Sequence, residues 1–143
     1  MEVIEKLDLN LRNMIETFAT IGVEKYLTKI KVNEHHLIAD EPLEDNGKNL
    51  GPSPFDLLAS ALSACTLITM KMYADRKDWP LTDFNVTTFY ENAGKDDQKL
   101  IRKISIPNTY TSEQKERLLT IANKCPVHKI LIKSIPIDSI LVD

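Results

Sequence analysis

Ser53-Pro-Phe-Asp-Leu-Leu-Ala-Ser-Ala-Leu-Ser-Ala-Cys-Thr-Leu-Ile-Thr-Met-Lys-Met-Tyr73 is the stretch that decides the fold of this chain. A proline and an acid near its start suit the first turn of a helix and its dipole, and the pattern predicts one long helix over residues 54–77. Such a helix is about 36 Å long and crosses a domain of this size. Residues 57–70 are uncharged, but these 14 residues are fewer than the ~20 of a bilayer span. We therefore predict a buried core helix.

Both faces of the predicted helix are small or apolar. The face centred on Cys65 is formed by Leu58, Ala61, Leu62, Ile68, Thr69 and Met72, and the opposite face by Ala59, Ser60, Ser63, Leu67 and Met70. Such a helix needs cover on nearly every side, which is more than one small subunit supplies. We therefore expect a homodimer in which paired helices are wrapped by sheets.

Short strands are predicted on both sides of this helix. Residues 15–39 alternate apolar residues with lysines and predict a strand meander with a tight turn at Asn33-Glu34. Glycines and prolines within residues 43–54 predict a loop. After the long helix we expect a hairpin from residues 83–91 and 100–106, a helix capped near Thr111, a short helix over 126–133 and a last strand over 135–142. The predicted order is β-β-β-α-β-β-α-α-β, an α+β fold.

Length and charge narrow the class of protein. The 143 residues fit one domain over 1–143, with residues 1–13 as an N-terminal arm. A net charge of −3 with both signs interspersed argues against nucleic acid as a partner. The first residues lack the basic and apolar regions of a secretory signal, which favours the cytoplasm. In that reducing compartment cysteines are more often free, redox-active or metal-bound than structural bridges.

Cys125 directly precedes Pro126, where we expect a helix to begin. Unpaired backbone N–H groups at a helix start favour a thiolate and lower its pKa where the site is partly wet. A buried, inert cysteine in a helix junction is the alternative. His128, one turn on, either packs or tunes this thiol. Cys125 and His128 offer two ligands where zinc needs three or four, so we expect no metal.

Cys65 lies in the middle of the apolar helix. Burial raises the pKa of a thiol and keeps it inert unless a cation or hydrogen-bond donor reaches it. From its local pattern alone, Cys65 is a core residue.

The wider setting of both cysteines changes this interpretation. The segments Gly51-Pro-Ser-Pro-Phe-Asp, Tyr73-Ala-Asp-Arg-Lys-Asp-Trp-Pro-Leu and Cys125-Pro-Val-His resemble the OsmC family and its organic hydroperoxide resistance (Ohr) relatives, especially the OsmC-like branch. Asp40-Glu41-Pro42 also resembles that branch, although a solvated turn explains it equally well. The resemblance runs from about Tyr26 to the C-terminus.

The resemblance implies an intertwined α+β homodimer with two central helices between sheets and active sites near the interface. It also implies a peroxidase that reduces organic hydroperoxides without metal or organic cofactor. Cys65 would attack the hydroperoxide and become a sulfenic acid, Cys125 would resolve it as a disulfide, and a dithiol would reduce that bond.

Two positions depart from the family pattern. The family places an acid ten residues before the helix cysteine, where this chain has Phe55, while Asp56 is nine residues before Cys65. On an ideal helix Asp56 points away from Cys65 and lies about 13 Å along the axis, so as a catalytic residue it would serve the other subunit. An acid that stabilises the helix start is the alternative. The family also uses an arginine from an earlier strand; the cations upstream that qualify here are Arg12, His35, His36 and Lys29.

Two further functions fit the same sequence. One is an OsmC-like dimer that binds ligands or serves a stress response without peroxidase activity. The other is a stress-regulated structural protein with inert buried cysteines.

Overall fold

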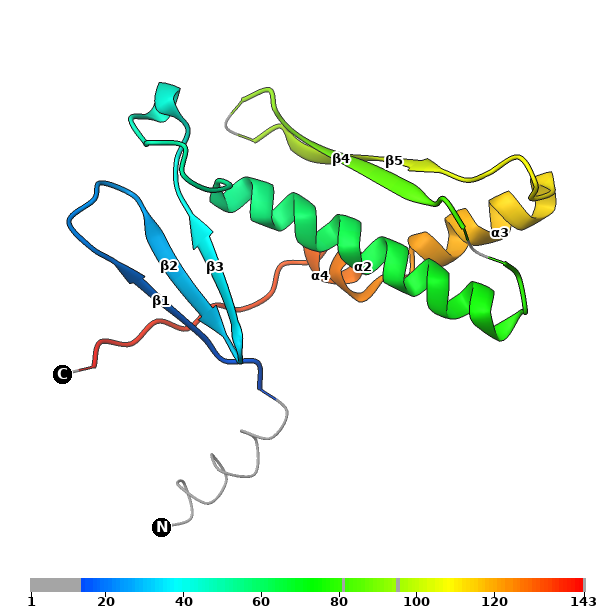
Figure 1. The fold of residues 1–143 in the computed structure, drawn as a ribbon, viewed down its shortest axis with the longest axis horizontal. Helices are drawn as coiled ribbons and strands as arrows, with labels where there is room; N and C mark the ends of the chain where they lie inside the picture. Colours follow the sequence, from blue (N-terminus) through cyan, green and yellow to red (C-terminus); the bar gives the residue numbers. More distant parts are fainter. Residues whose placement is uncertain (1–13, 81, 95, 143) are drawn as a thin grey trace, which may run out of the picture. The chain divides into compact units, whose positions relative to one another are not determined.

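The structure is a computed structural model of the chain and describes residues 14–80, 82–94 and 96–142. The chain forms two compact units, residues 1–54 and 55–143, each with its own antiparallel sheet (Figure 1). The predicted α+β fold with one long helix is confirmed. The predicted arm lies outside the described residues, and a single domain over the whole chain stays a prediction.

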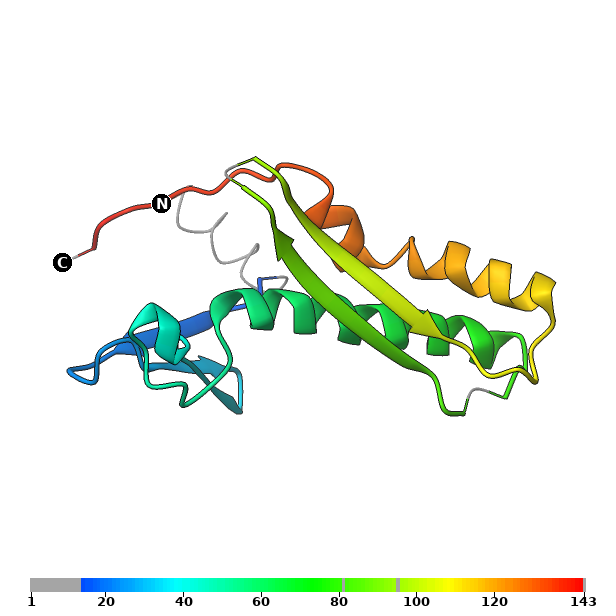
Figure 2. The same cartoon turned by 90° about the horizontal axis from the view of Figure 1, so that it is seen from above.

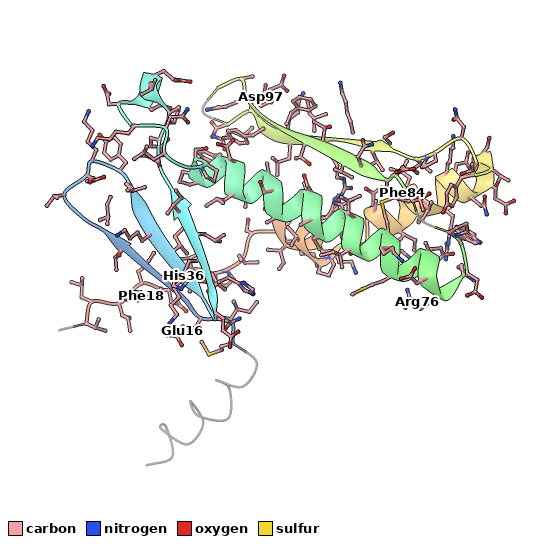
Figure 3. The ribbon with its side chains drawn as sticks, viewed as in Figure 1. Glu16, Phe18, His36, Arg76, Phe84 and Asp97 are labelled. Carbon is pink, nitrogen blue, oxygen red and sulfur yellow. The ribbon has the colours of Figure 1, made fainter. Side chains whose placement is uncertain are left out.

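The first unit contains a three-stranded sheet in the order β1-β2-β3. Its strands are β1 (Thr17–Ile21), β2 (Thr28–Val32) and β3 (His35–Ala39). They confirm the strands predicted within residues 15–39. The turn falls at Asn33-Glu34 as predicted, and Asn33 takes the left-handed φ of 53° that asparagine tolerates. Phe18 and His36 lie opposite the same residue of β2 and share one face of this sheet (Figure 3).

Asp40 anchors the loop that follows β3. Its side chain is only 2% exposed, and its carboxylate accepts backbone N–H bonds from Glu41 at 2.8 Å and Leu50 at 3.1 Å. The Leu50 bond is the main reason that the pKa of Asp40 lies below its usual value. The interpretation of Asp40 as part of a solvated turn is therefore wrong, because backbone donors replace water. The loop itself is confirmed and includes a short helical turn, η1 (Leu43–Asp45).

The second unit is built on the long helix α2 (Pro54–Arg76), which confirms the central prediction. A hairpin crosses this helix, and two shorter helices lie beside it under the same hairpin (Figure 2). These elements are β4 (Asn85–Asn92), β5 (Gln98–Ser105), α3 (Ser112–Ala122) and α4 (Pro126–Leu131). All four were predicted, with bounds that differ by a few residues. Thr111 caps α3 by accepting from the backbone N–H of Gln114.

Burial alternates along both strands of the hairpin and shows which side chains face the helices. Every second residue is half-buried, and its neighbours are exposed. The half-buried residues form three facing pairs, Val86 with Ile104, Thr88 with Arg102, and Tyr90 with Leu100. The inner face of the hairpin therefore changes from apolar to polar and back along its length.

The core of this unit lies between the second half of α2, α3 and the hairpin. It is formed by Met70, Tyr73, Tyr110, Leu118, Ile121 and Ala122. Trp79 packs edge-on against Tyr73 and Tyr110, with ring centroids 5.7 and 6.4 Å apart. Trp79 thus covers the end of α2. Phe84, which directly precedes β4, packs against the same core (Figure 3).

The two faces of α2 differ sharply in burial. One face packs in the core through Leu62, Thr66, Met70, Tyr73 and Ala74. The other leaves Ile68 54% and Met72 61% exposed. Among the described residues, α2 is also the one helix that is long and apolar enough to cross a membrane, with a mean hydropathy of 1.4. Its packed face shows that it serves here as the core helix of an α+β unit.

The strand predicted over residues 135–142 is wrong for the single chain. This segment follows α4 without regular structure, and its apolar side chains, such as Ile137 at 86% exposed, face solvent. A strand needs a neighbour to pair its backbone groups. No other described segment of this chain pairs with it.

Candidate functional site

The two cysteines meet in the second unit. Cys65 lies halfway along α2. The Cys125 thiol and the backbone N–H of Val127 lie near enough to its sulfur to lower the pKa of Cys65. The Thr69 hydroxyl, one turn further along α2, lies 4.0 Å from the Cys65 sulfur. Both cysteines are free, Cys65 is partly buried and Cys125 has no exposed surface. The folded chain therefore brings together two thiols that are sixty residues apart in sequence.

Cys125 occupies the position that the sequence predicts. It is the N-cap of α4, and Pro126 fills the first helical position, where a missing N–H costs no hydrogen bond. The chain therefore turns into α4 with Cys125 beside Cys65. Its side chain makes no capping hydrogen bond, although the nearby N–H groups of Val127 and His128 favour a negative charge on its sulfur.

The two thiols differ in their affinity for a proton. Burial by itself raises the pKa of Cys65, but the surrounding donors and a positive charge outweigh it, so the pKa of Cys65 lies below its usual value. Burial raises the pKa of Cys125, and the neighbouring Cys65 raises it further, beyond what the N–H groups of Val127 and His128 offset. These two directions favour a thiolate on Cys65 beside a protonated Cys125.

The local sequence left both outcomes open. A lowered pKa was expected for Cys125 only in a partly wet site, but Cys125 is fully buried, and burial and the adjacent sulfur raise its pKa. Cys65 was expected to be inert unless a cation or donor reached it, and groups from α4 and the hairpin do so and lower its pKa. Neither effect is visible within one helix.

Arg102 is the cation that sequence reasoning missed. It projects from β5 into the space beside the thiols, and its positive charge is one cause of the lowered pKa of Cys65. Burial lowers the pKa of Arg102 itself, and the two sulfurs counteract this effect. A guanidinium remains protonated in proteins, so it provides a permanent positive charge.

Four groups hold the guanidinium of Arg102 in place. They are Thr66 Oγ1 at 2.7 Å, Ala122 O at 3.3 Å, Asn123 Oδ1 at 2.8 Å and His128 Nδ1 at 3.4 Å. They come from α2, the end of α3 and α4. Arg102 therefore connects all three helices while it faces the sulfurs.

A sequence signal for Arg102 was present downstream of the cysteine helix. Arg102 falls between Leu100 and Ile104 in the alternation of β5, on the face that covers the helices. A charged residue in the apolar phase of an amphipathic strand is rarely buried without a partner.

Polar contacts continue along the same layer. Thr66 donates its hydroxyl to Leu62 O at 2.6 Å as it accepts from Arg102. One turn earlier in α2, the hydroxyls of Ser63 and Thr88 are hydrogen-bonded at 2.7 Å. Ser63 and Thr66 thus form a polar seam between α2 and the hairpin.

The other predicted site residues have different placements. His128 contacts Arg102, and because a guanidinium only donates, His128 Nδ1 is the acceptor in this bond. Asp56 is exposed in the first turn of α2, about 13 Å along the helix from Cys65. Asp56 therefore stays a prediction as a catalytic residue. Within the described residues, no three His, Cys, Asp or Glu side chains gather to hold a metal ion.

A pocket of about 430 Å³ lies beside the hydrogen-bond network of Arg102. Its lining comes from α2, both strands of the hairpin and α4, and includes Leu58, Leu62, Tyr90, Leu100, His128 and Leu131. Leu62 and His128 also belong to the hydrogen-bond network around Arg102. The volume is in the range of small-molecule sites, and most of the lining is apolar.

Comparisons with known proteins place the chain in a family. The family model described as OsmC-like protein matches residues 46–139. No curated protein matches the chain.

Solved structures show the same fold. A Psychrobacter arcticus protein named for osmotic stress induction and a detoxification response has a TM-score of 0.71 at 21% identity, over 81% of this chain and 87% of its own. An organic hydroperoxide resistance protein, OsmC, from Legionella pneumophila has a TM-score of 0.61 at 20% identity, over 82% and 88%. An organic hydroperoxide resistance protein from Elizabethkingia anophelis has a TM-score of 0.66 at 19% identity, over 81% and 86%.

Proposed function

This chain belongs to the OsmC-like protein family, and we propose that it is a thiol-dependent peroxidase that reduces organic hydroperoxides in the cytoplasm. One observation carries the proposal: a Cys65 sulfur whose pKa is lowered lies beside a protonated Cys125 and a guanidinium. A thiolate is the reactive form of cysteine, and a second thiol within contact distance can trap the oxidised product.

The first step is the reduction of the hydroperoxide. The Cys65 thiolate attacks the terminal oxygen of ROOH, so a sulfur–oxygen bond forms as the oxygen–oxygen bond breaks. The electron pair of that bond leaves with RO⁻, which takes a proton from solvent and departs as the alcohol. Cys65 is left as a sulfenic acid, oxidised by two electrons.

The second step restores the pair for another cycle. The Cys125 sulfur attacks the Cys65 sulfenic acid, a disulfide forms, and the hydroxyl departs as water with the proton of Cys125. A dithiol reductant then returns both cysteines to thiols by exchange. No metal or organic cofactor takes part in this cycle.

Arg102 is proposed to stabilise the negative charge, which passes from the Cys65 sulfur to the departing oxygen in the first step. Its guanidinium stabilises the thiolate before attack and the oxygen that becomes negative as the bond breaks. A donor fixed before reaction is more effective than water, because it needs no reorganisation. The network to Thr66 and Asn123 supplies that fixed position.

Assembly is part of the same proposal. Members of this family are typically dimers, and we place a second copy against the exposed apolar face of α2. Asp56 then serves the thiols of the other subunit. Light scattering at micromolar concentration tests this point, since a stable monomer would contradict it.

The pocket supports a second function, in which the dimer binds a small apolar ligand without reducing it. The proposal for this function depends on the lining of the pocket alone and needs no reactive Cys65. The Cys65→Ser variant separates the two. A peroxidase loses all turnover in this variant, whereas a pure binding protein shows no turnover to lose and keeps its ligand.

The decisive experiment is stopped-flow mixing of the reduced protein with cumene hydroperoxide. We expect Cys65 oxidation to be far faster than that of free cysteine, and mass spectrometry to find a Cys65–Cys125 disulfide after one equivalent. The Cys125→Ser variant should stop at the sulfenic acid. Oxidation no faster than free cysteine would refute the peroxidase.

A further inference from the structure

One of the four acceptors around Arg102 can change its charge. Arg102 Nη2 donates to His128 Nδ1 at 3.4 Å and to Asn123 Oδ1 at 2.8 Å, and Nη1 donates to Thr66 and Ala122. An amide, a hydroxyl and a backbone carbonyl stay neutral at every pH that a protein tolerates. Histidine is the side chain that ordinarily changes its charge between pH 5 and 8. Of the four acceptors, His128 is therefore the one that mild acid can remove.

The contact between Arg102 and His128 requires a neutral imidazole. Because a guanidinium only donates, Nδ1 must carry no proton, and the proton of the neutral ring lies on Nε2. In an imidazolium both nitrogens carry protons and neither can accept. Protonation of His128 would place two positive groups 3.4 Å apart, and the guanidinium keeps its own proton. The hydrogen bond therefore breaks when His128 is protonated.

The groups around His128 include further cations. The titratable and charged groups that face it from the packed elements are Arg102 and Lys99 of β5, Tyr90 of β4, Cys65 of α2, and Cys125 and Lys129 at α4 itself. The Lys99 ammonium is paired with the exposed Glu91 at 2.8 Å. Of the described residues that line the pocket with His128, none carries a carboxylate. A positive charge on His128 is thus not offset within the pocket wall.

Loss of this hydrogen bond loosens one side of the guanidinium. Thr66 and Ala122 still hold Nη1, but Asn123 alone remains for Nη2. Asn123 is exposed, so water competes for its side chain. The proposed reaction depends on a guanidinium fixed before the oxygen–oxygen bond breaks, because a fixed donor needs no reorganisation. A loosened Arg102 should therefore slow that step.

From these observations we infer that His128 is a positioning residue for Arg102 that acts only in its neutral form, so that mild acid releases one side of the guanidinium and slows the reduction of hydroperoxides. This inference rests on the proposed peroxidase function and adds a regulation of the same site. The contact is complete where His128 is neutral and is lost as pH falls. Its loss adds to the loss of the Cys65 thiolate, which acid also causes.

The test compares two variants that differ in the acceptor. His128→Asn places an amide oxygen near the position of Nδ1 and cannot be protonated in this range, whereas His128→Leu has no acceptor. The measured quantity is the rate constant of Cys65 oxidation by cumene hydroperoxide in wild type, divided by that in His128→Asn, from about pH 8 to about pH 5. The division removes the titration that Cys65 undergoes in both proteins.

We expect this ratio to fall about tenfold between the two ends of the range, the lower end of what a hydrogen bond to a charged group contributes. At the alkaline end, His128→Asn should react about tenfold faster than His128→Leu, because only asparagine restores the acceptor. His36→Asn is the matched control, since His36 is an exposed histidine of the first unit. It should keep the pH profile of wild type. A constant ratio, or His128→Asn as slow as His128→Leu, would overturn the role of His128.

A spectroscopic measurement makes the result independent of turnover. In the Cys65→Ser background, the side-chain Nε–H resonance of Arg102 is assigned by nuclear magnetic resonance from its loss in Arg102→Met. It should shift over the same pH range when His128 is present and stay constant in His128→Asn. Equal behaviour in both proteins would overturn the inference. A wild type that fails to reduce cumene hydroperoxide, with a resonance that shifts only when His128 is present, would overturn the peroxidase and support the acid-sensitive contact.

Discussion

Asp40 in the first unit and Cys65 in the second are both acids whose pKa lies below its usual value, yet their surroundings are built differently. Asp40 is held by backbone N–H groups of its own loop, Leu50 foremost. Cys65 is held by a thiol, a backbone N–H and a guanidinium from α4 and the hairpin. The comparison teaches that the same lowering of a pKa can serve two purposes. At Asp40 the carboxylate is used up in hydrogen bonds that fix the loop. At Cys65 the neighbouring groups stabilise a thiolate, which is the reactive form of cysteine.

Among the variants considered, Arg102→Met should have the largest effect on Cys65 and should remove its likeness to Asp40. The variant removes the positive charge beside Cys65, so the pKa of Cys65 should rise and its oxidation by cumene hydroperoxide should slow by about a hundredfold or more. Stopped-flow oxidation and alkylation by iodoacetamide measure both effects. Lys103→Met is the matched control, because Lys103 is the exposed neighbour on the same strand. Equal losses in both variants would show that Arg102 has no specific role.

The pH dependence should separate the two acids. The lowered pKa of Cys65 means that its thiolate persists below the ordinary cysteine pKa of about 8.5 and is lost as pH falls through its own lower value. Alkylation of Cys65 should therefore have its midpoint below that of free cysteine. In Cys125→Ala, which removes a donor, the midpoint should move upward. A midpoint at the free-cysteine value in wild type would contradict the proposed thiolate.

Titration of Asp40 should affect the protein at a lower pH than titration of Cys65, and it should change only the stability of the fold. Its folded pKa is depressed, so its contribution is complete above the ordinary aspartate pKa of about 3.9 and is lost as pH falls through the lower folded value. Asp40→Asn should lower the midpoint of thermal unfolding at neutral pH by several degrees and leave Cys65 alkylation unchanged. The exposed Asp45 supplies the control Asp45→Asn, which should change neither quantity.

Thr69→Val should have the smallest effect. The Thr69 hydroxyl lies 4.0 Å from the Cys65 sulfur, a weak contact compared with the thiol and the guanidinium. Because valine keeps the shape of threonine, the oxidation rate should fall by less than about twofold. A larger loss would mean that the thiolate depends on donors within α2 more than on those from α4 and β5.

Much of the fold was predictable because its signals are local. The uncharged run in α2, the alternation in β2 and β5, and the cap at Thr111 each depend on neighbours within a few residues. The segment after α4 shows the limit of such signals. Its apolar alternation is typical of a strand, but a strand forms only where another backbone is available to pair with it.

The candidate site was predictable only in part. The motifs around Cys65 and Cys125 pointed to both thiols, and the cap at Cys125 was located correctly. The resemblance already made Cys65 the attacking thiol and Cys125 the resolving one, but the local patterns could not rank their pKa values, because burial and donors from other elements decide them. Arg102 was missed for the same reason, as its partners lie on three helices that no sequence window contains.

The order of the elements, the long apolar helix and the identity of the two thiols were determined by the sequence itself, since periodicity and capping act over one or two turns. Which thiol keeps its proton and which cation faces the two thiols were decided only by the tertiary structure. These properties depend on charges and dipoles a few ångströms apart in space, and packing alone brings those groups together.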